Sequence, residues 1–318
     1  MYKNYYGFSE EPFALNHDPK FLFLARSHFE ALSAMMSGIQ EKKGIIIISG
    51  EAGVGKTTLI YALLNDLSEK LKTAFIFNPR LDSKELLEII LRDLEVPMRE
   101  GEKKLPSLLL QFRKYLNERL LREETVAVVI DEAQSLEEEV LEVLLRLSSP
   151  DIPAAKLLQT VLVGHPELEV KLDAEKLRPF QNRITVRRQV GPLTREEGRG
   201  YIKHRLKVVG RDISEIFTSE AINRIWEFAG GIPRVMNLLC DRALLIGYSK
   251  SSPIIDSKIV KEARQDFTHL RPRKSEIQRS PSSQKKPRYR VIRILFLIFA
   301  VCIFVLSLSK VLTLIFRK

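Results

Sequence analysis

The 318-residue chain is 45% hydrophobic and 29% charged, which is typical of a folded globular protein and argues against a disordered one. Its net charge of +11 resembles that of a nucleic-acid-binding protein, but the segment 271–318 holds twelve Lys and Arg against one Glu. Residues 1–270 are therefore neutral overall, and the charge does not argue for DNA binding. The two distant cysteines, Cys240 and Cys302, exclude a disulfide framework and favour a reducing compartment.

A Gly-rich loop follows the first predicted strand, at 45–49, and precedes an amphipathic helix predicted over 57–71. The loop reads GEAGVGKTT and meets the pattern G-x-x-x-x-G-K-[ST], in which backbone N–H groups bind phosphate. We expect Lys56 to reach the β- and γ-phosphates of ATP and the Thr57 hydroxyl to coordinate Mg²⁺. The residues predicted to surround the phosphates are Gly50, Glu51, Ala52, Gly53, Val54, Gly55, Lys56, Thr57 and Thr58.

An acidic pair follows a second apolar run. The stretch VAVVIDEAQ at 126–134 predicts a buried parallel strand that ends at Asp131 and Glu132. Asp131 is predicted to hold Mg²⁺, directly or through water, and Glu132 to accept a proton from the attacking water. The alternative is that the two acids only cap the helical stretch that follows.

Three further strands are predicted at 73–77, 157–164 and 183–190, and helical segments at 83–94 and 105–121 separate some of them. This alternation predicts an α/β fold, a parallel sheet with helices on both faces and a ligand at the carboxyl ends of the strands. His165 comes directly after one such end. Two interpretations stay open for it, a γ-phosphate sensor that helps to place the water or a loop histidine without a role.

The pattern becomes helical after Gly191 and predicts an all-α lid domain beside the nucleotide. Thr194 stands three residues before Glu197, as in a capping box. The helices are predicted at 194–210, 218–230, 231–249 and from 256 onward.

The C-terminal part of the chain predicts a membrane anchor. Residues 271–291 read as a basic, flexible linker and 292–316 as a transmembrane helix, because the 23 apolar-rich positions 294–316 would extend about 34 Å as a helix. Nine Lys and Arg before the apolar run favour a cytoplasmic location for the preceding domain, near anionic lipid. The alternative is a buried helix of the globular part.

Several blocks, in order, resemble the ExeA/GspA-type AAA+ ATPases of bacterial general secretion. The resemblance implies a P-loop AAA+ αβα core at 1–190, including an aromatic N-terminal segment beside the adenine, and a helical lid at 191–270. It implies that Arg234 contacts the γ-phosphate, that Arg178 or Arg183 acts as a finger on a neighbouring subunit's ATP, and that the protein is a homo-oligomer. The blocks that carry it are YYGFSEEPFALNHDPKFLFLARSHFEAL, KLLQTVLVGHPEL, LRPFQNRITVRRQVGPLTREE, YIKHRL and GGIPR.

The resemblance favours a membrane-anchored ATP hydrolase at the bacterial inner membrane, with its ATPase domain in the cytoplasm. It would assemble or regulate an envelope machine, with inner-membrane or secretin-type proteins of type II secretion, pilus or exopolysaccharide/exosortase systems as partners. Secretion members carry a periplasmic peptidoglycan-binding region after the anchor, whereas this sequence stops at Lys318, so we do not expect cell-wall binding. The alternatives are a DNA-binding ATPase of the transposition-helper type and a nucleotide-gated scaffold with negligible turnover.

Overall fold

A computed structural model describes most of the chain up to His269, and Met1–Arg271 form one compact unit. The predicted linker at 271–291 and the predicted transmembrane helix at 292–316 lie outside the described residues. No helix within the described ranges is long and apolar enough to cross a membrane. The ranges are 2–16, 18–66, 71–77, 79–98, 104–148 and 156–269.

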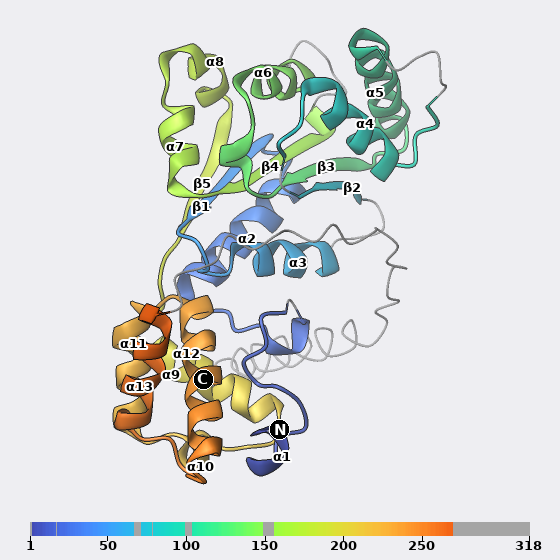
Figure 1. The fold of residues 1–318 in the computed structure, drawn as a ribbon. Helices are drawn as coiled ribbons and strands as arrows, with labels where there is room; N and C mark the ends of the chain where they lie inside the picture. Colours follow the sequence, from blue (N-terminus) through green and yellow to red (C-terminus); the bar gives the residue numbers. More distant parts are fainter. Residues whose placement is uncertain are drawn as a thin grey trace, which may run out of the picture. The chain divides into compact units, whose positions relative to one another are not determined.

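A five-stranded parallel sheet organises the first part of the unit (Figure 1). All neighbouring strands are parallel, in the order β2-β3-β4-β1-β5, which confirms the predicted α/β class. Parallel order brings the carboxyl ends of β1, β3 and β4 to one edge, where the sequence places its loop and acidic pair. The strands are β1 (Ile45–Gly50), β2 (Leu71–Ile76), β3 (Thr125–Ile130), β4 (Leu158–Gly164) and β5 (Ile184–Val190).

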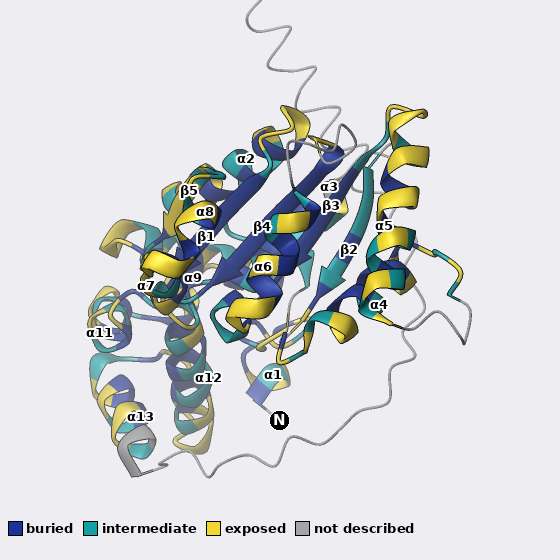
Figure 2. Ribbon diagram, turned by 90° about the horizontal axis from the view of Figure 1, so that it is seen from above, coloured by how far each residue is buried: buried dark blue, intermediate teal, exposed yellow. Residues whose placement is uncertain are grey.

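Helices cover both faces of the sheet, and the buried strand β1 shows why. Ile45 and Ile47 belong to one hydrophobic cluster, whereas Ile46 and Ile48 belong to another, because successive side chains of a strand point to opposite faces. Figure 2 shows the central strands buried and the outward sides of the helices exposed. One face is covered by α2 (Arg26–Gln40) and α3 (Lys56–Asp66), the other by α4 (Ser83–Asp93), α5 (Leu105–Leu120), α6 (Glu138–Leu147), α7 (Pro166–Leu172) and α8 (Arg178–Gln181).

One predicted boundary is wrong. The amphipathic pattern predicted that the helix after the loop runs to position 71, but α3 is assigned over Lys56–Asp66 and β2 begins at Leu71. Leu71 packs against the cluster that also holds Leu59 and Leu63 of α3. An apolar residue that faces this cluster fits the period of the helix and of the strand alike, so the pattern did not separate them.

The second part of the unit is a helical block, as the sequence predicted. Thr194 forms the expected capping box, since its hydroxyl accepts from the Glu197 N–H at 3.2 Å and the Glu197 carboxylate accepts from the Thr194 N–H at 2.9 Å. The block contains α9 (Arg195–Val208), α10 (Ile213–Ile216), α11 (Ser219–Ala229), α12 (Pro233–Ser249) and α13 (Ser257–His269).

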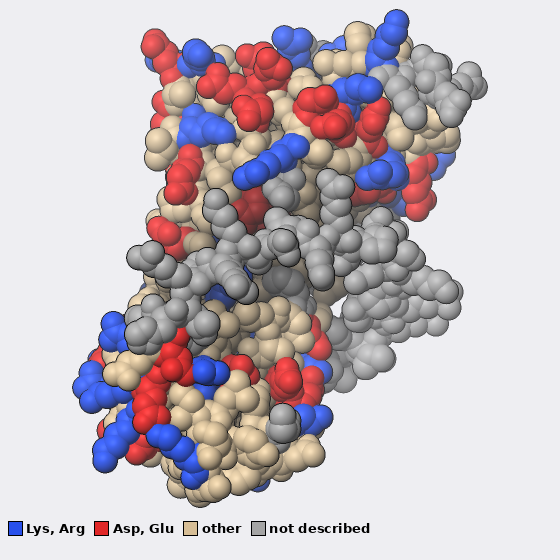
Figure 3. Space-filling view, viewed as in Figure 1, with Lys and Arg blue, Asp and Glu red and all other residues tan. Residues whose placement is uncertain are grey.

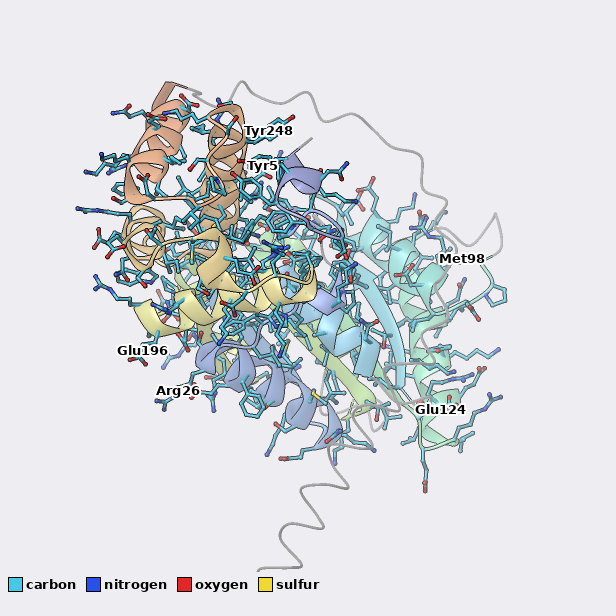
Figure 4. The ribbon with its side chains drawn as sticks, turned by 90° about the horizontal axis from the view of Figure 1, so that it is seen from below. Tyr5, Arg26, Met98, Glu124, Glu196 and Tyr248 are labelled. Carbon is cyan, nitrogen blue, oxygen red and sulfur yellow. The ribbon has the colours of Figure 1, made fainter. Side chains whose placement is uncertain are left out.

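The aromatic N-terminal segment packs into this helical block, although we expected it within the 1–190 core. It starts with α1 (Tyr2–Tyr5) and contains a short 3₁₀ turn, Pro19–Phe21. Tyr5 lies against Tyr248 of α12 with the ring centroids 5.4 Å apart, and Figure 4 shows the pair. The aromatic side chains of this segment that are buried in the helical block's own cluster are Tyr2, Tyr6, Phe8, Phe13 and Phe21.

A single carboxylate joins the two parts of the unit. Besides closing the capping box of α9, Glu197 accepts a hydrogen bond of 2.9 Å from the Arg26 N–H at the start of α2. Figure 4 labels Arg26 near the start of α2 and Glu196, the residue before Glu197, near the start of α9. One side chain therefore satisfies unpaired backbone donors at two helix N-termini and holds the lid next to the sheet.

Candidate nucleotide-binding site

The Gly-rich loop spans 51–55, between the end of β1 at Gly50 and the start of α3 at Lys56. Gly53 has a φ of +80° and Gly55 a φ of +111°, conformations that residues with a side chain rarely adopt. A Cβ added at Gly53 would lie 2.8 Å from the Cβ of Arg234, so the loop also needs glycine because the lid helix approaches it closely.

The loop borders a cavity of about 460 Å³ between the sheet edge and the lid. Six of the nine predicted phosphate-binding residues line it, whereas Glu51 is exposed, Val54 is buried in the core and Gly50 ends β1. The six are Ala52, Gly53, Gly55, Lys56, Thr57 and Thr58.

Lys56 is 5% exposed, and its ammonium donates to the carbonyls of Gly50 at 2.8 Å and Glu51 at 3.0 Å. Burial lowers the pKa of Lys56, and the charges of Glu132 and Asp131 oppose that shift. A buried cation that is held by two neutral carbonyls is suited to bind an anion that enters the cavity.

Thr57 and Asp131 meet at the end of β3. The Thr57 hydroxyl donates to Oδ2 of Asp131 at 2.6 Å, and Oδ1 accepts from the Glu132 N–H at 2.9 Å. Asp131 is 2% exposed, and burial raises its pKa above the usual 3.8. A hydroxyl and a carboxylate are hard oxygen ligands, so this pair fits a Mg²⁺ ion that takes its remaining ligands from phosphate and water. Within the described ranges no three His, Cys, Asp or Glu cluster as a metal cage would require.

Glu132 lines the cavity in a left-handed conformation, with φ 54° and ψ 36°. Its Oε2 accepts from the Gln134 side-chain amide at 2.6 Å and lies 3.4 Å from Nε2 of His165. Gln134 also accepts from the His165 backbone N–H at 3.0 Å. The Glu132 carboxylate is thus oriented by two neighbouring side chains and stands on a backbone in a rare conformation, an arrangement suited to orient a water molecule.

The lid contributes the opposite wall of the cavity. The Arg234 N–H, at the start of α12, donates to the Gly53 carbonyl at 3.2 Å, and the Arg234 side chain lines the cavity. The structure therefore brings Lys56, Thr57, Glu132, His165 and Arg234 to one cavity, with Asp131 hydrogen-bonded to Thr57 beside it.

The two candidate finger arginines lie away from this cavity. Arg183 precedes β5, at the opposite end of the strands, and its Nη1 donates to the Leu145 carbonyl at 2.7 Å. Arg178 begins α8 and is exposed. Neither lines the chain's own cavity, so their role on a neighbouring subunit stays a prediction.

Sequence reasoning missed several residues of the site. Asn237 lines the cavity one helical turn after Arg234, and that i, i+3 spacing was available as a signal. Tyr201 and Arg205 also line it; both belong to the block YIKHRL, which was used for the resemblance but was given no role at the site. His28 was missed too, and its Nε2 lies 2.7 Å from the Val54 carbonyl under the loop.

The strand order, the loop after β1, the acidic pair after β3 and the helical lid define a P-loop nucleotide-binding protein of the AAA+ fold. Comparison with known proteins agrees, since residues 39–172 match the AAA domain family. General secretion pathway protein A of Aeromonas hydrophila is 37% identical over 252 residues, which are 79% of this chain and 46% of that protein. The chain thus spans about half the length of this relative.

Solved structures share the fold at low sequence identity. Cdc6p from Pyrobaculum aerophilum has a TM-score of 0.65 at 15% identity, over 80% of this chain and 70% of that chain. The ORC2 protein of Aeropyrum pernix has a TM-score of 0.62 at 18% identity, over 81% and 72%. These structures show the fold alone. The sequence matches to protein A and to the AAA domain family group the chain with the AAA+ proteins of the ExeA/GspA type.

Proposed function

We propose that this chain hydrolyses Mg-ATP in the cavity between loop and lid and uses the turnover in secretion or a related envelope process. The observation that carries the proposal is the group formed by Lys56, Thr57, Asp131 and Glu132, which supplies a cation, two oxygen ligands and a base at one strand edge. These are the parts that phosphoryl transfer to water requires.

Each side chain has a separate task in the proposed reaction. Lys56 binds phosphate oxygens, and Thr57 and Asp131 hold Mg²⁺, which neutralises charge on the phosphates when it is bound. Glu132 accepts the proton of the water whose oxygen attacks the terminal phosphorus, while the bond from that phosphorus to the ADP oxygen breaks. Arg234 places a second cation on the lid side, so the angle of the lid depends on the presence of phosphate.

The envelope role rests on kinship and on sequence. The relative's name, General secretion pathway protein A, supports a client in secretion. The apolar run at 292–316, after a basic segment, supports attachment to the bacterial inner membrane with the ATPase in the cytoplasm. We further propose a homo-oligomer in which Arg178 or Arg183 reaches the neighbouring subunit's nucleotide, with an inner-membrane or secretin-type protein as the client.

Charge does not favour the DNA-binding alternative. On the face that Figure 3 shows, Lys and Arg are interspersed with Asp and Glu, and residues 1–270 are neutral overall. A protein that neutralises several phosphates of DNA would need an excess of cations on one face.

The test is capture of partners from native membranes by the full chain carrying Glu132→Gln, with ATP present and after nuclease treatment. Lys56→Ala serves as the nucleotide-free control. We expect secretin, pilus or polysaccharide-export proteins with Glu132→Gln and not with Lys56→Ala. Capture of DNA-transaction proteins, or of the chain alone, would overturn the proposed role.

A further inference from the structure

A buried arginine on the lid side of the cavity has carbonyl and hydroxyl partners and no carboxylate partner among the described residues. Arg205 of α9 is 4% exposed. Its guanidinium donates to the Pro12 carbonyl, to the Ala14 carbonyl at 2.9 Å and to the Tyr201 hydroxyl at 2.8 Å. Arg205 thereby fixes the N-terminal segment beside the cavity. Leu15, the residue after Ala14, lines the cavity.

The hydrogen bonds of Tyr201 determine the orientation of a neighbouring amide. An arginine only donates, so the Tyr201 hydroxyl must accept from Arg205 and has one proton left to donate. That proton goes to Oδ1 of Asn237 at 2.8 Å. The amide oxygen of Asn237 is thus directed at Tyr201, and its NH₂ group has no partner among the described residues.

The Asn237 side chain lines the cavity, so a ligand bound there could contact its NH₂ group. It is 5% exposed, it lies on α12 three positions after Arg234, and both side chains line the cavity opposite Lys56. The Asn237 NH₂ is not one of the buried side-chain atoms that lack a partner, so it is open to the cavity, where it can donate to a ligand. Lys56 and Arg234 are the cations proposed to bind phosphate, so a nucleotide held between them would bring phosphate or sugar oxygens, which accept hydrogen bonds, close to this amide.

We propose that the Asn237 amide donates a hydrogen bond to an oxygen of the bound nucleotide, and that Tyr201 and Arg205 act as positioning residues that aim it. The inference rests on the proposed nucleotide-binding function and adds to it a polar contact from the lid. It also explains why a buried arginine is used to hold a tyrosine hydroxyl rather than to pair with an acid.

The test measures the affinity of the full chain for ADP and for a non-hydrolysable ATP analogue, with Mg²⁺, by titration calorimetry. We expect Asn237→Ala to weaken binding about tenfold, as for a lost hydrogen bond to a charged group. Asn237→Asp should weaken it at least as much, because the carboxylate still accepts from Tyr201 but repels phosphate. Asn223→Ala, on lid helix α11, is the matched control and should bind like the wild type.

Tyr201→Phe separates positioning from folding, because it removes only one oxygen from the core. We expect about threefold weaker binding, and we expect the Tyr201→Phe/Asn237→Ala double variant to match Asn237→Ala alone. A loss for ATP only would place the acceptor on the γ-phosphate, and an equal loss for ADP on the rest of the nucleotide. Wild-type affinity in Asn237→Ala, or additive losses in the double variant, would overturn the inference, whereas absence of binding in the wild type would overturn the proposed function instead.

Discussion

The two walls of the cavity are built in different ways. On the sheet side, Lys56 and Thr57 belong to one short stretch, and Asp131 and Glu132 directly follow a strand, so local sequence and parallel strand order position them. On the lid side, Arg205 bonds to a carbonyl 193 residues away in sequence, and Asn237 depends on Tyr201 for its orientation. The sheet wall holds the residues proposed for hydrolysis, whereas the lid wall is held by hydrogen bonds between residues far apart in sequence.

The largest expected effect is the loss of ATP hydrolysis when one side chain of the sheet wall, Glu132, is changed. Glu132→Gln keeps the shape of the side chain but removes the base, so hydrolysis should fall about 10²- to 10⁴-fold while ATP affinity stays within about twofold. Phosphate release and equilibrium binding measured on one preparation check this. Unchanged phosphate release would remove Glu132 from the reaction.

Removal of the loop cation should abolish binding rather than chemistry. Lys56→Ala deletes the buried ammonium that faces the cavity. We expect affinity for ATP to fall about 100-fold or more, because among the described residues no other Lys or Arg of the sheet wall lines the cavity. Titration of the variant with a fluorescent ATP analogue measures it. Near-native affinity would contradict the assignment.

A change on the lid wall should instead lower stability. Arg205→Met removes the donors for the buried Pro12 carbonyl and the partly buried Ala14 carbonyl, and we expect a loss of about 2 to 4 kcal/mol in the free energy of unfolding. Denaturant unfolding of the full chain checks the value. Arg195→Met is a control on the same helix whose arginine is exposed. Equal stability of both variants would show that the lid wall does not depend on the buried contacts.

The smallest expected effect is on the pH dependence of the free energy of unfolding, through His28, which links α2 to the loop. His28 must carry its proton on Nε2, because the Val54 carbonyl only accepts. Its Nδ1 is buried and has no partner in the part of the chain that the structure describes. Burial lowers the pKa of His28, although the Val54 carbonyl and the Glu197 charge oppose the shift. The unfolded chain therefore binds this proton first as the pH falls, so the contribution to stability is complete above about pH 6.5 and is lost toward lower pH.

The measurement is the free energy of unfolding at pH 7.5 and 5.5 for the wild type and for His28→Gln. We expect the wild type to lose more stability than the variant over this interval, by at most about 1.4 kcal/mol per pH unit. Parallel pH dependence in the two proteins would show that His28 titrates as it does in the unfolded chain.

The sequence predicted one wall far better than the other, and the reason is physical. Five strands and the loop follow from apolar runs and glycines, which are local signals, and the Thr194 capping box was found in the same way. The end of α3 was misplaced at Leu71 because helix and strand periods overlap there.

The sequence did not predict the contacts of the lid wall, because the residues that hydrogen-bond there are far apart in the chain. Nothing near Arg205 reveals that Pro12 and Ala14 accept from it, and Gln134 bridges Glu132 and His165 only when β3 and β4 lie side by side. Only Asn237, one turn after Arg234, carried a local signal. The prediction for Arg234 came from the family resemblance. The predicted roles of Arg178 and Arg183 depend on a neighbouring subunit.

The most direct test of the account is an experimental structure of the Glu132→Gln full chain with Mg-ATP. We predict a nucleotide that bridges both walls, with phosphate oxygens in hydrogen-bond contact with Lys56 and Arg234, the metal on Thr57 and Asp131, and the Asn237 amide on a nucleotide oxygen. A nucleotide held by the loop alone, with the lid wall out of contact, would contradict the account.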